Sequence, residues 1–208
     1  MKNKRKKKQN KSKSKILLLV VLLVLIIGVV IFFQTRTKLQ VITVVSNIDD
    51  YNYYLESNAT KVYKKYYDEL KKELKDKKID EEKYASLIVK LFLIDYYTLN
   101  NKVTNKDIGG TQFLHSNLQD KFIKESSESI YKYVENNLYG KRKQELPEVK
   151  DVEIKNIEKI IYEQKDYKDD SGYKLEAKIT YKKDLKYPKE VNITLIHENN
   201  KLVIVEIN

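Results

Sequence analysis

Apolar residues follow three different patterns along the chain. From Ile16 to Phe33 they form an unbroken run of 18 residues. Between residues 57 and 138 they recur at spacings of three and four, and from Val149 onward they alternate with polar residues. The first pattern is typical of a helix that is apolar on all faces, the second of helices with one apolar face, and the third of half-buried β-strands.

Three amphipathic helices are predicted in the middle of the chain. The first begins near Ser57-Asn58, because both residue types are favourable N-caps. The second begins at Asp80 and runs to about Leu99, and its broad apolar stripe predicts that it is the most buried helix of the domain. The third opens with the capping-box pattern S-x-x-Q at residues 116–119, and Gly140 is its expected stop.

Short extended segments are expected around these helices. Lys38–Val45 is rich in β-branched residues and reads as a short strand or a stalk. Ser46–Asp50 is expected to be a loop. Gly109-Gly110 predicts a turn, followed by a short strand at Thr111–Leu114.

Four antiparallel strands are predicted in the last third of the chain. The first starts near Glu148, and its alternation slips at Asn156-Ile157, which indicates a bulge or bend. The second, Tyr173–Tyr181, has the cleanest alternation and follows a turn at Asp169–Gly172. The last two strands and the hairpin turn between them are predicted at Val191–Leu195, Lys201–Ile207 and Glu198–Lys201.

Helices followed by hairpin-connected strands predict an α+β fold. We expect three helices packed on a bent antiparallel sheet of about four strands. The chain divides into a basic tail (1–15), a transmembrane helix (16–33), a stalk or linker (34–56) and an α+β domain (57–208). We find no internal repeat.

The predicted membrane span rests on the length of the apolar run and on its flanks. Eighteen helical residues rise about 27 Å, close to the hydrocarbon thickness of a bilayer. The tail holds nine Lys or Arg and no acidic residue, which predicts a cytoplasmic N-terminus and an extracellular domain. The sequence therefore favours a single-pass protein of the cell membrane with an uncleaved signal anchor. A cleaved signal peptide is the alternative, although such peptides have a shorter apolar core and a small-residue cleavage site.

The charge of the chain resides mostly in this tail. The net charge is +11, and removing the nine tail charges leaves 32 Lys plus Arg against 30 Asp plus Glu, or +2. A nearly neutral domain gives no reason to expect nucleic-acid binding. There is no Cys, so packing must stabilise the domain without disulfides. This usage, rich in Lys, Asn, Ile and Tyr, resembles exported proteins of low-GC Gram-positive bacteria.

No catalytic, cofactor-binding or metal-binding residue is assigned from the sequence. The two histidines, His115 and His197, match no metal-binding spacing, and there is no Cys for thiol chemistry. Asp95 interrupts the apolar run LFLIDYY, and a carboxylate there is either paired and buried or faces a pocket. A pocket enzyme would draw on Asp95, Asp107, His115 and Tyr96.

The predicted order of helix, helix, short strand, helix and four strands over residues 55–208 resembles the nuclear-transport-factor-two-like cone fold. A basic tail (2–15), one span (16–33) and an exported domain resemble the layout of the VirB-eight-type inner-membrane scaffold of type IV secretion and conjugation systems. That resemblance implies a scaffold that assembles with other membrane components and performs no chemistry.

Two functions follow as expectations. The first is a membrane-anchored, non-enzymatic assembly or interaction module of a cell-envelope or conjugative transfer machine, with envelope proteins or a second copy as partners. A cell-division or sporulation scaffold shares this layout. The alternative is an extracytoplasmic ligand-binding sensor or small cone-fold enzyme with a cavity near Asp95 and His115.

Overall fold

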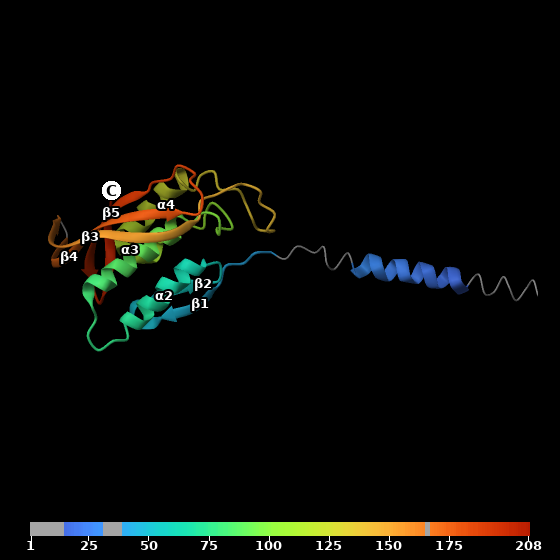
Figure 1. Cartoon of the computed structure of the whole chain (residues 1–208), viewed down its shortest axis with the longest axis horizontal. Helices are drawn as coiled ribbons and strands as arrows, with labels where there is room; N and C mark the ends of the chain where they lie inside the picture. Colours follow the sequence, from blue (N-terminus) through green and yellow to red (C-terminus); the bar gives the residue numbers. More distant parts are fainter. Residues whose placement is uncertain (1–14, 31–38, 165–166) are drawn as a thin grey trace, which may run out of the picture. The chain divides into compact units, whose positions relative to one another are not determined.

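The computed structural model describes residues 15–30, 39–164 and 167–208. The chain divides into two compact units, Met1–Leu39 and Gln40–Asn208. In the first unit, residues 15–30 form a helix whose apolar side chains are exposed. Figure 1 shows this helix in blue.

The predicted membrane span requires a correction. Among residues 15–30, 39–164 and 167–208, no helix is long and apolar enough to cross a membrane. This contradicts the transmembrane, signal-anchor and single-pass cell-membrane predictions. The end of the predicted span, residues 31–33, lies outside the described residues.

The second unit confirms the α+β class but contains two sheets where one was predicted. A two-stranded sheet pairs β1 with β2, and a four-stranded antiparallel sheet has the order β3-β4-β5-β6. The elements are β1 (Val44–Ile48), η1 (Asp49–Tyr51), β2 (Tyr53–Glu56), α2 (Lys61–Glu73), α3 (Glu81–Tyr97), η2 (Thr111–Phe113), η3 (Ser116–Leu118), α4 (Gln119–Glu128), β3 (Val149–Gln164), β4 (Tyr167–Tyr181), β5 (Glu190–Glu198) and β6 (Lys201–Ile207).

Side-chain caps set where the first two helices of this unit begin. The Thr60 hydroxyl accepts a hydrogen bond from the Tyr63 N–H at 3.3 Å, so the N-cap of α2 lies two to three residues later than predicted. Asp80 caps α3 as predicted, because its Oδ1 accepts the Lys83 N–H at 3.1 Å. Helix α3 ends at Tyr97, with Thr98 as its C-cap.

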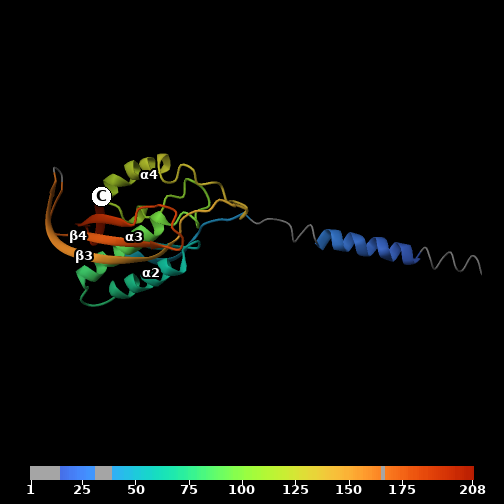
Figure 2. The same ribbon diagram turned by 45° about the horizontal axis from the view of Figure 1, so that its top comes forward.

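Helix α3 is the centre of the domain. It packs against α2 on one side and against β3, β4 and β6 on the other, and Figures 1 and 2 show it running along the inner face of the sheet. Most of its side chains are therefore buried, as its broad apolar stripe predicts. The buried residues of α3 are Tyr84, Ala85, Leu87, Ile88, Val89, Leu91, Phe92, Leu93, Ile94 and Tyr97.

The alternation predicted for β4 is confirmed. Tyr173, Leu175, Ala177 and Ile179 are buried, and the residues between them are exposed. The predicted slip in β3 is also confirmed, since the register with β4 shifts between Ile154 and Asn156. Two further shifts, after Val149 and Ile160, accompany the bend of the long β3–β4 ribbon in Figure 2.

The turn between β5 and β6 forms where it was predicted. Asn199 has a φ of 57°, in the left-handed region that Asn tolerates. The predicted turn at Asp169–Gly172 is wrong, because these residues continue β4. The chain between β3 and β4 passes through residues 165–166, which lie outside the described residues.

Two predictions around the third helix are also wrong. Thr111–Phe113 forms a 3-10 helix and not a strand. The backbone of Tyr54 hydrogen-bonds with the Gln112 side chain, whose Oε1 accepts the Tyr54 N–H at 2.8 Å and whose Nε2 donates to the Tyr54 carbonyl at 3.1 Å. Ser116 does not cap a helix, since its hydroxyl donates to Glu198 Oε1 at 2.6 Å. Helix α4 instead begins at Gln119 and ends at Glu128, well before Gly140.

Candidate functional site

Asp95 is held by two charge-assisted contacts at the C-terminal end of α3. Its Oδ1 accepts a hydrogen bond from Lys102 Nζ at 2.6 Å, and its Oδ2 accepts the Gly110 N–H at 2.7 Å. The Lys102 side chain is only 2% exposed and that of Asp95 19%. The Asp95 carboxylate is therefore paired, as one of the two sequence-based alternatives expected. These contacts attach the loop after α3 to the helix.

The Gly109-Gly110 pair is explained by close approach to α3. A Cβ atom on Gly109 would lie 2.3 Å from the Asp95 carbonyl oxygen and 2.7 Å from Lys102 Nζ. Gly110 has a φ of +79°, and a Cβ there would lie 2.6 Å from the Phe92 ring. The glycines thus allow the loop to reach the Asp95 carboxylate.

Asp95 also lines a small polar pocket between β2, α2 and α3. Its volume is about 10 Å³, room for the centre of one water molecule. The lining residues are Tyr54, Glu56, Asn58, Ala59, Thr60, Tyr63, Ile94, Asp95, Asn101 and Gln112. We call this the Glu56 pocket.

Two acceptors in the Glu56 pocket lack partners among the described residues. The Oδ1 atom of Asn101 has less than 1 Å² of exposed surface and no hydrogen-bond partner. No hydrogen bond or ion pair within the described part of the chain reaches the Glu56 carboxylate. Burial raises the pKa of Glu56, the charges of Asp95 and Asp107 add to this, and Lys102 opposes it.

The other predicted site residues do not join Asp95. His115 is buried, its Nδ1 accepts the Asn117 N–H at 3.2 Å, and its Nε2 lies 3.3 Å from Glu198 Oε1. Asp107 accepts two backbone N–H groups of its own loop. The Tyr96 hydroxyl lies 3.1 Å from that of Ser126 on α4. Of the predicted candidates, only Asp95 lines the Glu56 pocket.

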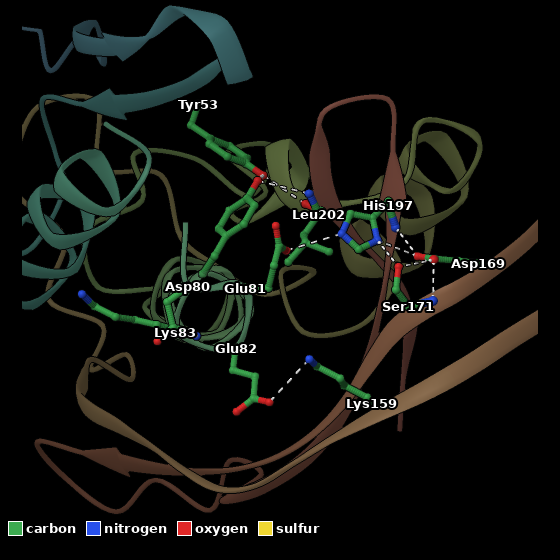
Figure 3. A network of polar contacts seen from close by, with 11 residues as sticks. Tyr53, Asp80, Glu81, Glu82, Lys83, Lys159, Asp169, Ser171, His197 and Leu202 are labelled. Atoms are coloured by element: carbon green, nitrogen blue, oxygen red, sulfur yellow. Dashed lines mark hydrogen bonds and ion pairs between the residues drawn. The ribbon is translucent and has the colours of Figure 1, made fainter. Parts of the chain in front are cut away.

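A second polar cluster, which the sequence did not predict, surrounds His197. Figure 3 shows its ring between Asp169 of β4 and Glu81 at the start of α3. Its Nδ1 lies 2.8 Å from Asp169 Oδ2, and its Nε2 lies 3.4 Å from Glu81 Oε2. Burial would raise the pKa of Asp169, but hydrogen bonds from His197 and Ser171 outweigh this and hold that pKa below its usual range.

This cluster does not have the geometry of a nucleophilic triad. In such a triad the nucleophile contacts one ring nitrogen and the carboxylate the other. Here carboxylates face both nitrogens of His197, and the Ser171 hydroxyl lies 3.0 Å from Asp169 Oδ1 and 3.4 Å from His197 Nδ1, the nitrogen already facing Asp169. The cluster therefore ties the start of α3 to the sheet.

A much larger opening is a groove between α4 and β6 with a volume of about 480 Å³. We call it the α4–β6 groove. Its floor holds aromatic and aliphatic side chains, with charged residues at the rim. The lining residues are Tyr96, Tyr97, Leu114, Leu118, Lys121, Phe122, Glu125, Ser126, Ser129, Ile204, Val205, Glu206, Ile207 and Asn208.

The α4–β6 groove meets the edge of β6 rather than one of its faces. Successive side chains of a strand point to opposite faces, yet Val205 to Asn208 all line the groove. Strand β6 is also the last strand in the sheet order. Its backbone edge is therefore one wall of the groove.

The rest of this edge is already occupied. The Ile204 carbonyl accepts the His115 N–H at 2.9 Å, next to a single parallel bridge from Leu114. The Leu202 N–H donates to the Tyr84 hydroxyl at 3.1 Å, and the Leu202 carbonyl accepts from Tyr53 at 3.0 Å. Tyr53 and Leu202 appear in Figure 3. The open part of the edge thus begins after Ile204.

No group of three or more His, Cys, Asp or Glu side chains able to hold a metal ion occurs in residues 15–30, 39–164 and 167–208. Comparison of the chain with protein-family models, with curated proteins and with solved structures gave no match.

Proposed function

We propose that this protein is a non-enzymatic interaction module that binds an extended segment of a partner protein in the α4–β6 groove. The observation that supports it is the placement of a free strand edge beside an apolar floor. Peptides that add to a sheet edge gain affinity from main-chain hydrogen bonds and specificity from side-chain pockets. The groove offers both.

The backbone groups available to a partner are on Ile207. Asn208 and Asn192 exchange both backbone hydrogen bonds, at 2.8 and 2.9 Å. Backbone groups of successive residues in an antiparallel strand point alternately toward and away from the neighbour. The N–H and C=O of Ile207 therefore point away from β5 and into the groove.

The apolar floor supplies the side-chain contacts. Tyr96 and Phe122 pack together with ring centroids 4.9 Å apart. Ile204 and Ile207 of β6 also line the groove. Aromatic side chains of this kind dominate binding energy at protein interfaces. An incoming strand with an apolar side chain would bury these groups while its backbone pairs with Ile207.

The state of the acid and histidine candidates supports a binding role over catalysis. Asp95 is engaged by Lys102 and Gly110, and both ring nitrogens of His115 face partners. A general acid or base must reach a substrate proton. Neither group lines the α4–β6 groove.

The test is selection of ten-residue peptides from a displayed library against the full chain, followed by affinity measurement on three variants. Ile207→Pro removes the outward N–H, Ile207→Val keeps it, and Phe122→Ala removes part of the floor. We expect Ile207→Pro and Phe122→Ala to weaken binding at least tenfold, which corresponds to about 1.4 kcal/mol, and Ile207→Val to leave it nearly unchanged.

Two results would overturn the proposal. Peptides that bind all three variants equally would occupy another surface. Self-association that Ile207→Pro abolishes, without any selected peptide, would make a second copy of the chain the occupant instead.

A further inference from the structure

His115 lies at the junction between the edge of β6 and the start of α4. Its backbone N–H donates to the Ile204 carbonyl of β6 at 2.9 Å, and its side chain caps the N-terminus of η3. Helix α4 begins at Gln119, directly after η3, and Leu118 at the end of η3 lines the α4–β6 groove. The His115 side chain is therefore connected to the helical wall of the groove through one short turn.

The two contacts of the His115 ring determine where its proton lies. Nδ1 is 3.2 Å from the Asn117 backbone nitrogen, and Nε2 is 3.3 Å from Glu198 Oε1. A flipped ring would place carbon atoms at both contacts, so the ring orientation is fixed. A backbone N–H can only donate and a carboxylate can only accept. His115 is therefore the neutral imidazole that carries its proton on Nε2 and accepts the Asn117 N–H with Nδ1.

Protonation of His115 removes the acceptor that caps η3. An imidazolium has a donor on both nitrogens and no acceptor, so the Asn117 N–H would lose its partner. The new Nδ1–H would face that N–H, because Nδ1 contacts no acceptor within residues 15–30, 39–164 and 167–208. His115 is only 5% exposed, which leaves little water to bond instead. Loss of an N-cap acceptor weakens the turn that it stabilises.

The groups packed against the ring do not replace this hydrogen bond. Among the described residues, the charged group that contacts the ring is Glu198 of β5, whose carboxylate also accepts from the Ser116 hydroxyl at 2.6 Å. The Tyr167 ring of β4 packs edge-on, with ring centroids 4.4 Å apart, and its hydroxyl bonds the Asn117 side-chain amide. Glu198 can balance the charge of an imidazolium through Nε2, but neither residue places an acceptor at Nδ1.

We propose that His115 is a pH-dependent switch: protonation of Nδ1 releases η3 from the His115 ring and loosens α4, the helical wall of the α4–β6 groove. Histidine is the side chain that ordinarily changes its charge between about pH 5 and pH 8. The release of α4 follows from contacts within the fold, whereas its effect on peptide binding rests on the function proposed for the groove.

Nuclear magnetic resonance of the isotope-labelled full chain tests the switch without a ligand. At pH 7.5 we expect the His115 ring to carry its proton on Nε2. Between pH 7.5 and pH 5 the hydrogen-exchange protection of the Asn117 amide, corrected for the intrinsic rate at each pH, should fall at least about fivefold, as for the loss of one hydrogen bond. The protection of the α4 amides should fall with it. A proton on Nδ1 at pH 7.5, or protection that does not change with pH, would overturn the proposal.

Two variants separate His115 from the other histidine. Asn is a favourable N-cap whose Oδ1 can accept the Asn117 N–H and does not titrate, so His115→Asn should make the protection independent of pH. His197→Asn removes the histidine between Asp169 and Glu81 and should leave the pH dependence in place. The opposite pattern would assign the effect to His197 and reject the switch at His115.

Peptides selected for the α4–β6 groove, and free of Asp, Glu and His, test the functional consequence. Their affinity should fall at least about fivefold from pH 7.5 to pH 5 in the parent chain and stay constant in His115→Asn. An unchanged affinity despite lower protection of α4 would overturn the link between the switch and the groove. If no peptide binds at either pH, the function proposed for the groove fails, and the exchange measurements alone decide whether the switch exists.

Discussion

The hydroxyl groups of Tyr53 and Tyr84 give the sharpest test of this structure. The two oxygens lie 2.8 Å apart, and each also bonds the backbone of Leu202 in the edge strand β6. Tyr53 uses its only proton on the Leu202 carbonyl, so Tyr84 must donate to Tyr53 and accept from the Leu202 N–H. The result is a closed ring of hydrogen bonds in which every donor and acceptor is used once.

Replacing Tyr84 with Phe breaks this ring at a defined point. The Leu202 N–H, in a residue that is 0% exposed, loses its partner, whereas Tyr53 keeps its bond to the Leu202 carbonyl. An unsatisfied buried donor costs about 1–3 kcal/mol. For a domain of this size a loss of about 2 kcal/mol lowers the Tm by roughly 4–8 °C.

Urea denaturation measures this loss directly, because the midpoint falls while the slope m stays constant. Tyr53→Phe should cost at least as much, since it leaves the Leu202 carbonyl and the Tyr84 hydroxyl proton without partners. The double variant should lose less than the sum of the two, because both changes break one ring. The matched control is Tyr133→Phe, at a side chain that is 76% exposed, with an expected change within about 0.5 kcal/mol.

A Tyr84→Phe variant within about 0.5 kcal/mol of the parent chain, at unchanged m, would refute this reasoning. Strict additivity of the two single variants would contradict the ring in particular, since independent hydrogen bonds add and a shared ring does not.

Three further predictions concern packing and pH. Gly109→Ala should cost about 1–3 kcal/mol in urea denaturation, because the new Cβ would lie 2.3 Å from the Asp95 carbonyl oxygen; an unchanged midpoint would contradict that packing. The lowered pKa of Asp169 predicts stabilisation above the unfolded value of about 3.9 that is lost as pH falls through the folded value, and Asp169→Asn should flatten the midpoint against pH below about pH 4. Burial raises the pKa of Tyr53 and Tyr63 well above the usual range, so stability should hold up to about pH 10 and fall above it as the unfolded chain alone loses these protons. A urea midpoint that stays constant from about pH 9 to pH 11 would argue against buried tyrosines.

Several elements of the fold could be predicted because local residues determine them. Asp80 caps α3 through a backbone N–H only three residues away, and the apolar stripe of that helix reports its burial on nearly all sides. The alternation in β4 and the left-handed Asn199 likewise depend on neighbours along the chain. Asp95 stands out in the sequence because its carboxylate interrupts an apolar run.

Tertiary contacts decided the remainder. Ser116 has the sequence of a helix cap, yet its hydroxyl is taken by Glu198, 82 residues away. Thr111–Leu114 has the composition of a strand, yet the Gln112 side chain provides the pairing to Tyr54. The Glu56 pocket is lined by residues of β2, α2 and α3 that lie far apart in the sequence. Strand β6 has an open edge because it is the last strand in the sheet order β3-β4-β5-β6. The periodicity of apolar residues is a local property that a sequence displays, whereas an unpaired acceptor or an open strand edge is defined by what the folded chain fails to place beside it.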